Sequence, residues 1–185
     1  MTPALTQFRF RWTGKARGNP IARTGTYIVR AGPEGRPTRK LGTFEWRRFA
    51  YPVDGPHGAR GYLGEFGAPR SGGRTHQGFD ITADCGTRVV AARGGKVMRS
   101  EFDPELHGNF VVVRGRGNGM RQWYSHLSNP SPFGEGDRVD TGRLVGHIGQ
   151  TGNAAGTPCH LHVELRRSGR LLDPEPRLAR WDRYG

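Results

Sequence analysis

Short runs that alternate apolar and polar residues fill most of the chain, and each run is closed by Gly, Pro or Asn. Alternation with a period of two is typical of strands, because successive side chains point to opposite faces of a sheet. Beyond residue 61 the pattern predicts strands at 86–92, 95–100, 109–116, 120–126, 143–148 and 160–167. Only "DPEPRLARW", which starts at Asp173, has room for a short helix. The sequence therefore predicts an all-β fold with an antiparallel sheet.

A smaller β-rich segment precedes this domain. The aromatic residues of "FRFRW" (8–12) alternate with arginines, "TYIVRA" (26–31) predicts a second strand, and a third apolar stretch at 44–49 follows the polar loop "GPEGRPTRKLG". "YPVDGPHGARG" is rich in Gly and Pro, as connectors are. We therefore expect a short β-strand module at 1–50, a linker at 51–61 and the main β domain at 62–185. The first module is similar to the end of an immunoglobulin-like domain, which implies a truncated Ig-like module.

Composition supports the β assignment and limits the partners. Thirty glycines and thirteen prolines disfavour long helices. The formal net charge of +13 comes almost entirely from arginine and attracts polyanions such as nucleic acid, anionic lipid or wall polymers. The arginines are scattered, as on a generally solvated basic surface. Only Arg9, Arg11 and Trp12 hint at the clustered arginines and exposed aromatics of a nucleic-acid binder, so we expect no nucleic-acid partner.

Membrane and export signals are absent from the sequence as given. No window approaches the roughly 18 apolar residues that cross a bilayer, so we expect no transmembrane segment. The N-terminus lacks a charged region followed by an apolar run, the signature of a secretory signal peptide.

The stretch "TPCHLHVEL" places two histidines and a cysteine together. In a strand, His160 and His162 project from one face, whereas Leu161 and Val163 point into a core. From these residues alone the stretch suits a metal site, a thiol nucleophile with its base, or a core strand carrying polar residues. The thiol reading is disfavoured because Cys159 faces away from His160 in an extended strand.

Two further motifs favour the metal reading. "HQGFD" supplies an imidazole and a carboxylate, His76 and Asp80, which are ligand types that zinc takes. A catalytic zinc uses three protein ligands and leaves a fourth position for water. His76, Asp80 and one of the two "HLH" histidines would form that set. In "WYSHL", alternation puts Tyr124 and His126 on one face, so His126 is a candidate imidazole for proton transfer beside the metal.

In this order, "THQGFDITADCGTRVVAARGGKV", "YSHL" and "GEGDRVDTGRLVGHIGQTGNAAGTPCHLHVEL" resemble the lysostaphin-like or LytM-type zinc endopeptidases of bacterial cell walls, over residues 66–173. The resemblance implies the antiparallel β fold of the duplicated hybrid motif type and one Zn²⁺ per chain. It implies zinc ligands at His76, Asp80 and His162, and catalytic histidines at His126 and His160. Some members of this family have lost ligands and act as non-catalytic activators of other wall hydrolases, whereas all five positions are intact here.

The resemblance implies a zinc-dependent endopeptidase that hydrolyses peptide bonds in peptidoglycan, at a cross-bridge or a stem peptide. The alternative is a weak or inactive wall-binding module that activates another hydrolase. Which of His126 and His160 is the general base stays open. Glu164 shares their strand face, so it is either an orienting group behind the metal ligands or a solvated edge residue. Peptidoglycan peptides are the expected partners, with anionic wall polymers as candidates for the basic surface.

The cysteines and the remaining histidines complete these expectations. Cys85 and Cys159 flank the two ligand segments, and our hypothesis is a disulfide between them, with buried reduced thiols as the alternative. A disulfide fits an oxidising compartment, so we expect the cell envelope, periplasm or extracellular space. The missing signal peptide then fits either a trimmed chain, which we favour, or a phage-type lysin released by another route. His57 and His107 lie in predicted loops and are expected to be surface residues. His147 is expected to lie at the surface or to have its hydrogen bonds satisfied.

Overall fold

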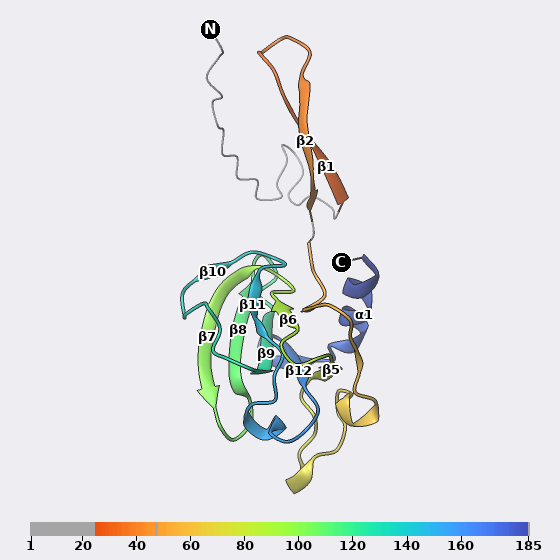
Figure 1. Cartoon of the computed structure of the whole chain (residues 1–185), viewed down its shortest axis with the longest axis vertical. Coiled ribbons are helices and arrows are strands. Elements are labelled where there is room, and N and C mark those ends of the chain that lie inside the picture. The colour runs from red at the N-terminus through yellow and green to blue at the C-terminus, as the bar shows by residue number, and fades with distance from the viewer. Residues whose placement is uncertain (1–24, 47, 185) are drawn as a thin grey trace. The chain divides into compact units, whose positions relative to one another are not determined.

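The computed structural model describes residues 25–46 and 48–184, and the chain forms two compact units, Met1–Arg48 and Phe49–Gly185. In the first unit, strands β1 (Gly25–Ala31) and β2 (Arg39–Trp46) pair as an antiparallel ribbon (Figure 1). The rings of Tyr27 and Phe44 stack across the ribbon with centroids 5.8 Å apart. The expected strand at 8–12 lies outside the described residues, and the Ig-like assignment stays a prediction.

The first unit differs from expectation in where its second strand starts. The polar stretch at 32–42 was expected to be loop throughout, but β2 already begins at Arg39. The pairing of Lys40 with Arg30 and of Arg39 with Ala31 extends the ribbon into this stretch. Both strands of such a ribbon satisfy backbone hydrogen bonds whether or not their side chains are apolar, so hydrophobic pattern alone misses the start.

The second unit is built on an eight-stranded antiparallel sheet. Seven of its strands lie in the order β10-β7-β8-β9-β12-β5-β4, and β13 pairs with β12. Their bounds are β4 Gly58–Ala59, β5 Phe79–Thr82, β7 Gly95–Asp103, β8 Gly108–Gly115, β9 Arg121–Leu127, β10 Arg138–Val139, β12 His160–Arg167 and β13 Arg170–Leu172. Strand β12 therefore lies in the interior of the sheet, between β9 and β5.

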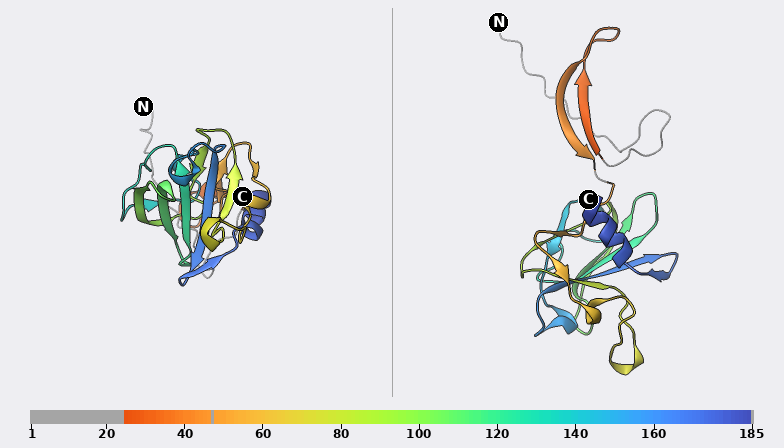
Figure 2. Two further views of the ribbon diagram at one scale, coloured as in Figure 1. Left: turned by 90° about the horizontal axis from the view of Figure 1, so that it is seen from below. Right: turned by 90° about the vertical axis from the view of Figure 1, so that its right-hand side faces the viewer.

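A three-stranded sheet completes the core. It has the order β11-β6-β3, with bounds β3 Val53–Asp54, β6 Arg88–Val90 and β11 Leu144–His147. One core cluster joins residues of both sheets, and among its members are Val53, Val89, Val145, Ile81, Val97, Val111, Val113, Tyr124, Leu161, Val163 and Leu165. Helix α1 (Glu175–Tyr184) lies on the outside of the strands in Figure 2 and adds Leu178 and Trp181 to this cluster.

The all-β, antiparallel prediction is confirmed, and the six strands predicted beyond residue 61 all occur with end shifts of a few residues. The helix expected in "DPEPRLARW" is α1. The expected linker at 51–61 contains the short strands β3 and β4, which pair with β6 and β5. Two-residue strands carry no alternating pattern, and their partners define them. No helix in the described part of the chain is long and apolar enough to span a membrane.

Candidate functional site

The pairing of β5 with β12 brings the predicted metal ligands together. Asp80 lies on β5 directly opposite His162 on β12, and His76 lies in the loop that enters β5. Gly78 makes this approach feasible, because a Cβ atom there would lie 2.4 Å from the Val163 carbonyl oxygen and 2.7 Å from His162 Cε1. The Gly in "HQGFD" is therefore required where the β5 backbone passes the His162 ring.

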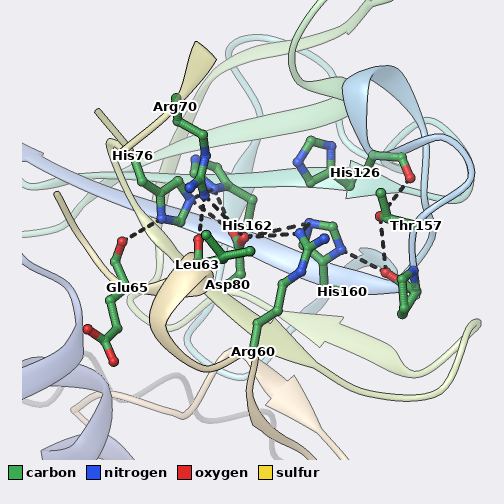
Figure 3. A network of polar contacts seen from close by, with 12 residues as sticks. Arg60, Leu63, Glu65, Arg70, His76, Asp80, His126, Thr157, His160 and His162 are labelled. Carbon is green, nitrogen blue, oxygen red and sulfur yellow. Dashed lines mark hydrogen bonds and ion pairs between the residues drawn. The ribbon is translucent and has the colours of Figure 1, made fainter. Parts of the chain in front are cut away.

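The three side chains form a tight buried cluster (Figure 3). His76 Nε2 lies 2.8 Å from His162 Nδ1 and 3.0 Å from Asp80 Oδ1. His162 Nδ1 lies 2.9 Å from Asp80 Oδ1. All three residues are at most 8% exposed. We call His76, Asp80 and His162 the ligand cluster.

The outer nitrogen of each imidazole has its own acceptor. His76 Nδ1 donates to the Glu65 carbonyl oxygen at 2.8 Å, and His162 Nε2 donates to Glu164 Oε1 at 3.3 Å. These bonds leave lone pairs on His76 Nε2 and His162 Nδ1, which converge with the Asp80 carboxylate on one point. Three acceptors this close repel one another unless a cation lies among them. Two imidazole nitrogens and a carboxylate oxygen suit Zn²⁺, so the residues present fit the metal.

In the metal-free protein, a proton can take the place of a cation between His162 and Asp80. Burial alone would lower the pKa of His162, but its bonds to Asp80 and Glu164 raise the pKa to about 9. Burial alone would raise the pKa of Asp80, but His162 and His76 hold it well below its usual range. A proton therefore holds the cluster together at neutral pH, and it competes with a metal for the same position.

Glu164 is buried behind the cluster and is not a solvated edge residue. It is 2% exposed, and its second oxygen accepts bonds from Arg166 at 2.7 and 2.9 Å. Burial would raise the pKa of Glu164, but His162 and Arg166 lower it. Glu164 is thus an ionised carboxylate that fixes the orientation of the His162 ring, as carboxylates behind metal-bound histidines do.

His126 and His160 lie beside the cluster with their ring centroids 5.0 Å apart. Each Nδ1 donates to a carbonyl oxygen, of Thr151 at 2.9 Å for His126 and of Pro158 at 2.9 Å for His160. Both rings therefore keep the lone pair on Nε2. Burial lowers the pKa of His126 to about 3 and also lowers the pKa of His160, so both are neutral at pH 7 and can accept a proton.

His126 reaches the site by a route that strand alternation does not predict. Alternation placed Tyr124 and His126 on one face, but Tyr124 is fully buried in the core, where its hydroxyl accepts from the Ala92 N–H at 2.8 Å. His126 has a left-handed backbone with φ of 64°. This conformation interrupts the alternation and turns the His126 ring away from the core face and toward His160.

Sequence reasoning missed two arginines beside the cluster. Arg60 Nη1 lies 3.3 Å from Asp80 Oδ2 and donates to His160 Nε2 at 3.1 Å, as Figure 3 shows. Arg70 Nη2 lies 3.8 Å from the same Asp80 oxygen and donates to the Leu63 carbonyl oxygen at 2.7 Å. No sequence signal identified them, because they stand in the Gly-rich stretch before "HQGFD". Together they face the Asp80 oxygen that points away from the cluster.

The expectation that His107 is a surface residue was wrong. His107 is half-buried, its Nδ1 lies 3.0 Å from Ser125 Oγ, and its ring lies 6.3 Å from that of His162. It also packs on Phe110 and Trp123. Burial lowers the pKa of His107. His57 is exposed, as expected, and stacks on Tyr51, while His147 is half-buried on β11.

A cavity of about 630 Å³ opens onto the cluster. Its lining includes the ligand cluster, both catalytic candidates His126 and His160, and the newly found Arg60, Arg70 and His107. A peptide of a few residues fits a volume of this size. The site therefore combines a metal-binding cluster, two neutral imidazoles and an open path for a polymer.

The two cysteines form a disulfide. Cys85 follows β5 and Cys159 precedes β12, and their Cα atoms lie 5.3 Å apart. The bond joins the ends of the two strands that carry Asp80 and His162, beyond the His160–Thr82 pair of the sheet: Cys159 directly precedes His160, and Cys85 lies three residues after Thr82. The sequence hypothesis thus agrees with the structure, and the bond constrains the pairing on which the cluster depends.

Comparison with known proteins assigns the family. The model of the family described as "Peptidase family M23" matches residues 74–174, more than half of the chain, so the chain belongs to peptidase family M23. The catalytic domain of the antimicrobial peptidase lysostaphin from Staphylococcus simulans superposes with a TM-score of 0.56 at 30% identity, over 67% of this chain and 92% of that domain. The predicted family resemblance and fold are confirmed.

Curated relatives include endopeptidases and a hydrolase activator. Peptidoglycan DD-endopeptidase ShyC of Vibrio cholerae is 34% identical over 101 residues, or 55% of this chain and 22% of ShyC. Glycyl-glycine endopeptidase ALE-1 of Staphylococcus capitis is 35% identical over 92 residues, or 50% of this chain and 25% of ALE-1. Murein hydrolase activator EnvC of Escherichia coli is 30% identical over 131 residues, or 70% of this chain and 29% of EnvC. The chain thus spans less than a third of the length of each of these three relatives.

Proposed function

We propose that this protein is a zinc-dependent endopeptidase that hydrolyses peptide bonds in bacterial peptidoglycan. The observation that carries the proposal is the complete ligand cluster, with donors 2.8 to 3.0 Å apart, next to two neutral imidazoles in an open cavity. Membership of peptidase family M23 and the endopeptidase relatives support it. Action on wall peptides, together with the disulfide, supports a location in the cell envelope or outside the cell.

In this proposal His76, Asp80 and His162 hold the zinc ion. When bound, zinc supplies a Lewis acid that polarises a carbonyl and lowers the pKa of water to about 7. His126 or His160 takes the proton of the attacking water on Nε2 and returns it to the leaving amine, and for His160 this requires that Arg60 first release its bond to that nitrogen. Arg60, which contacts both Asp80 and His160, holds these two side chains in position and adds positive charge where an oxyanion develops.

The deciding experiment digests purified peptidoglycan with the zinc-loaded protein, the chelated protein and His76→Ala, and counts newly released amino groups. Zinc-loaded protein should release them, and chelation or His76→Ala should lower the rate by at least about 10³-fold, a loss of the size that follows removal of an essential group. Chelated protein that cuts at the wild-type rate would overturn the mechanism. Analysis of the new termini identifies the cleaved bond, at a cross-bridge or a stem peptide.

The second candidate is a hydrolase activator without activity of its own, favoured by the match with EnvC over 70% of the chain. The intact ligand cluster argues against it. Zinc-loaded protein that releases no amino groups, yet accelerates peptidoglycan digestion by a separate wall hydrolase, would support the activator and exclude the endopeptidase.

A further inference from the structure

Five cationic side chains stand in one row across the large sheet. Strand pairing sets Arg138 opposite Lys96, Lys96 opposite Arg114, Arg114 opposite Arg121, and Arg121 opposite Arg166. Directly opposed residues project from the same face, so this cationic row crosses β10, β7, β8, β9 and β12 on one side of the sheet. At about 4.8 Å between strands it extends over roughly 19 Å.

The fold does not require this row. Like charges that face each other across strands are destabilising. Among the residues that the structure describes, Arg166 pairs with Glu164 at 2.7 Å, and no ion pair involves Lys96, Arg114, Arg121 or Arg138. Those four side chains are exposed, whereas their neighbours on the inner face, such as Val97 and Val113, form the core. The row therefore lowers stability, and a bound anion would offset that cost.

One end of the row borders a hollow whose charged lining is entirely cationic. This cavity of about 570 Å³ is lined by Lys96, Arg114, Arg116 and Arg138, together with Gly95, Gly115, Gly117 and Gly119. The glycines add no side chains, so the cationic groups remain accessible around the space. An acid, Asp140, lies 3.6 Å from Arg116 at its margin.

The row lies on the sheet face that carries the ligand cluster. His162 and Arg166 are four residues apart on β12, so they share a face and lie roughly 13 Å apart along the strand. Trp123 on β9 pairs with Glu164, between these two positions, and packs against Phe110 and Val112 on β8. The guanidinium groups of Arg99 and Arg166 cover the Trp123 ring. A polymer strand that lies on this face can contact the cationic row and, at the same time, enter the 630 Å³ cavity at the ligand cluster.

We propose that the cationic row binds the peptidoglycan strand beside the cleaved peptide, through the carboxylates of its neighbouring peptides. The proposal rests on the proposed function, because continuity with the ligand cluster makes the substrate itself the occupant. Guanidinium groups bind carboxylates through paired hydrogen bonds. Nucleic acid fits less well, because the exposed large apolar side chains of the described residues, such as Tyr62 and Phe102, lie outside the row and offer no base-stacking platform there.

Binding is the direct test. The row variant combines Lys96→Gln, Arg114→Gln and Arg121→Gln, and leaves Arg166 unchanged because it bonds Glu164. The matched control combines Arg143→Gln, Arg170→Gln and Arg180→Gln, which removes the same charge from exposed positions outside the row. All proteins carry His76→Ala so that the ligand is not digested, and sedimentation with acid-extracted, phosphate-free peptidoglycan gives the affinity. We expect about tenfold weaker binding and a flatter salt dependence for the row variant, and a change within about twofold for the control.

Three results would overturn the proposal. The first is equal binding by the row variant and the control, and the second is undiminished binding to peptidoglycan whose carboxylates have been amidated. The third is binding that depends on the row only for walls that retain phosphate polymers or for single-stranded DNA. Hydrolysis is measured separately, with His76 intact. The row variant should cleave a short soluble wall peptide at the wild-type kcat/KM, and should show a raised KM and unchanged kcat on intact peptidoglycan. If neither protein cleaves either substrate, the proposed function fails, while the binding result still decides the row.

Discussion

At the residue scale, His126 shows how the site depends on an unusual backbone. Among the described residues, His126 and Ser168 are the non-glycine residues with positive φ. A left-handed backbone costs roughly 1–2 kcal/mol for such a residue, so the surroundings must hold it. The His126 N–H donates to the His107 carbonyl oxygen at 2.8 Å, and Nδ1 donates to that of Thr151 at 2.9 Å. The strained backbone aims the ring at the cavity.

Replacement of His126 separates its chemistry from its backbone. Asn tolerates left-handed φ, whereas Ala does not, so His126→Asn should keep wild-type stability and His126→Ala should lose about 1 kcal/mol in urea unfolding. Both should bind zinc stoichiometrically and hydrolyse peptidoglycan about 10²–10⁴-fold more slowly if Nε2 transfers the proton. Zinc content and kcat distinguish the cases, and His160→Asn is the parallel variant. A kcat for His126→Asn within twofold of wild type would assign the proton transfer to His160.

Gly78 offers a second residue-scale prediction. An added methyl group would meet the Val163 carbonyl oxygen at 2.4 Å and His162 at 2.7 Å, so Gly78→Ala must displace the β5 backbone or the His162 ring. Zinc affinity, measured by competition with a chromogenic chelator, should fall at least about tenfold. Gly134→Ala is the control, because its new methyl group meets only Asp137 Oδ2 at 3.8 Å. Unchanged affinity in Gly78→Ala would show that the sheet absorbs the methyl group without moving the cluster.

At the scale of elements, sequence patterns predicted strands well where strands are long and alternate polar and apolar residues. Strand β12 is the example: His160, His162 and Glu164 share the site face, and Leu161, Val163 and Leu165 are at most 1% exposed on the other face. The pattern missed β3, β4 and β10, which are two residues long and are defined by their partners. It also misplaced Tyr124 relative to His126, because alternation assumes extended backbone at every position.

The residues of the candidate site also divide into those that the sequence predicted and those that it did not. The motifs "HQGFD" and "HLH" supplied His76, Asp80 and two candidate histidines, since ligand type and spacing are local properties. The choice of His162 over His160 came only from the family resemblance. Arg60 and His107 were not found, because their contacts to His160 and Ser125 span 100 and 18 residues and arise only from strand pairing. Register is set by packing over the whole sheet, so such partners cannot be read from one segment.

The disulfide between Cys85 and Cys159 yields a prediction about β5 and β12. It closes a loop with a sequence separation of 74, which stabilises the fold by about 4 kcal/mol through the unfolded chain. Cys85→Ser with Cys159→Ser should therefore lower Tm by roughly 10 °C, and thiol reductant should lower the wild-type Tm to the same value. The double variant is its own control, because reductant should leave its Tm unchanged. Equal Tm values for wild type and double variant would show that sheet pairing alone holds β5 against β12.

At the scale of the whole molecule, the stability of the second unit is linked to what occupies the ligand cluster. Strands β5 and β12 lie in the interior of the large sheet, and the cluster joins them to the loop of His76. A cation bound there stabilises the folded state, because the unfolded chain lacks the assembled cluster. In the metal-free protein that cation is the proton on His162, and this difference makes the two forms respond differently to pH.

The pKa of His162 is about 9 in the folded metal-free protein and about 6.5 in an unfolded chain. A raised pKa contributes stability that is fully present below pH 6.5 and is lost as pH rises through about 9. Zinc bound as proposed would take the place of this proton, so zinc-loaded protein should not show the loss. Urea unfolding at pH 6, 7.5 and 9 should therefore show a difference in unfolding free energy between zinc-loaded and chelated protein that widens with pH.

Calorimetry near pH 7 should also detect close to one proton released per zinc bound. In His162→Gln the chelated protein should lose its stability change over this window. Parallel pH profiles for the zinc-loaded and chelated wild type would mean that His162 carries no proton in the metal-free fold, and that another group balances the charge of Asp80.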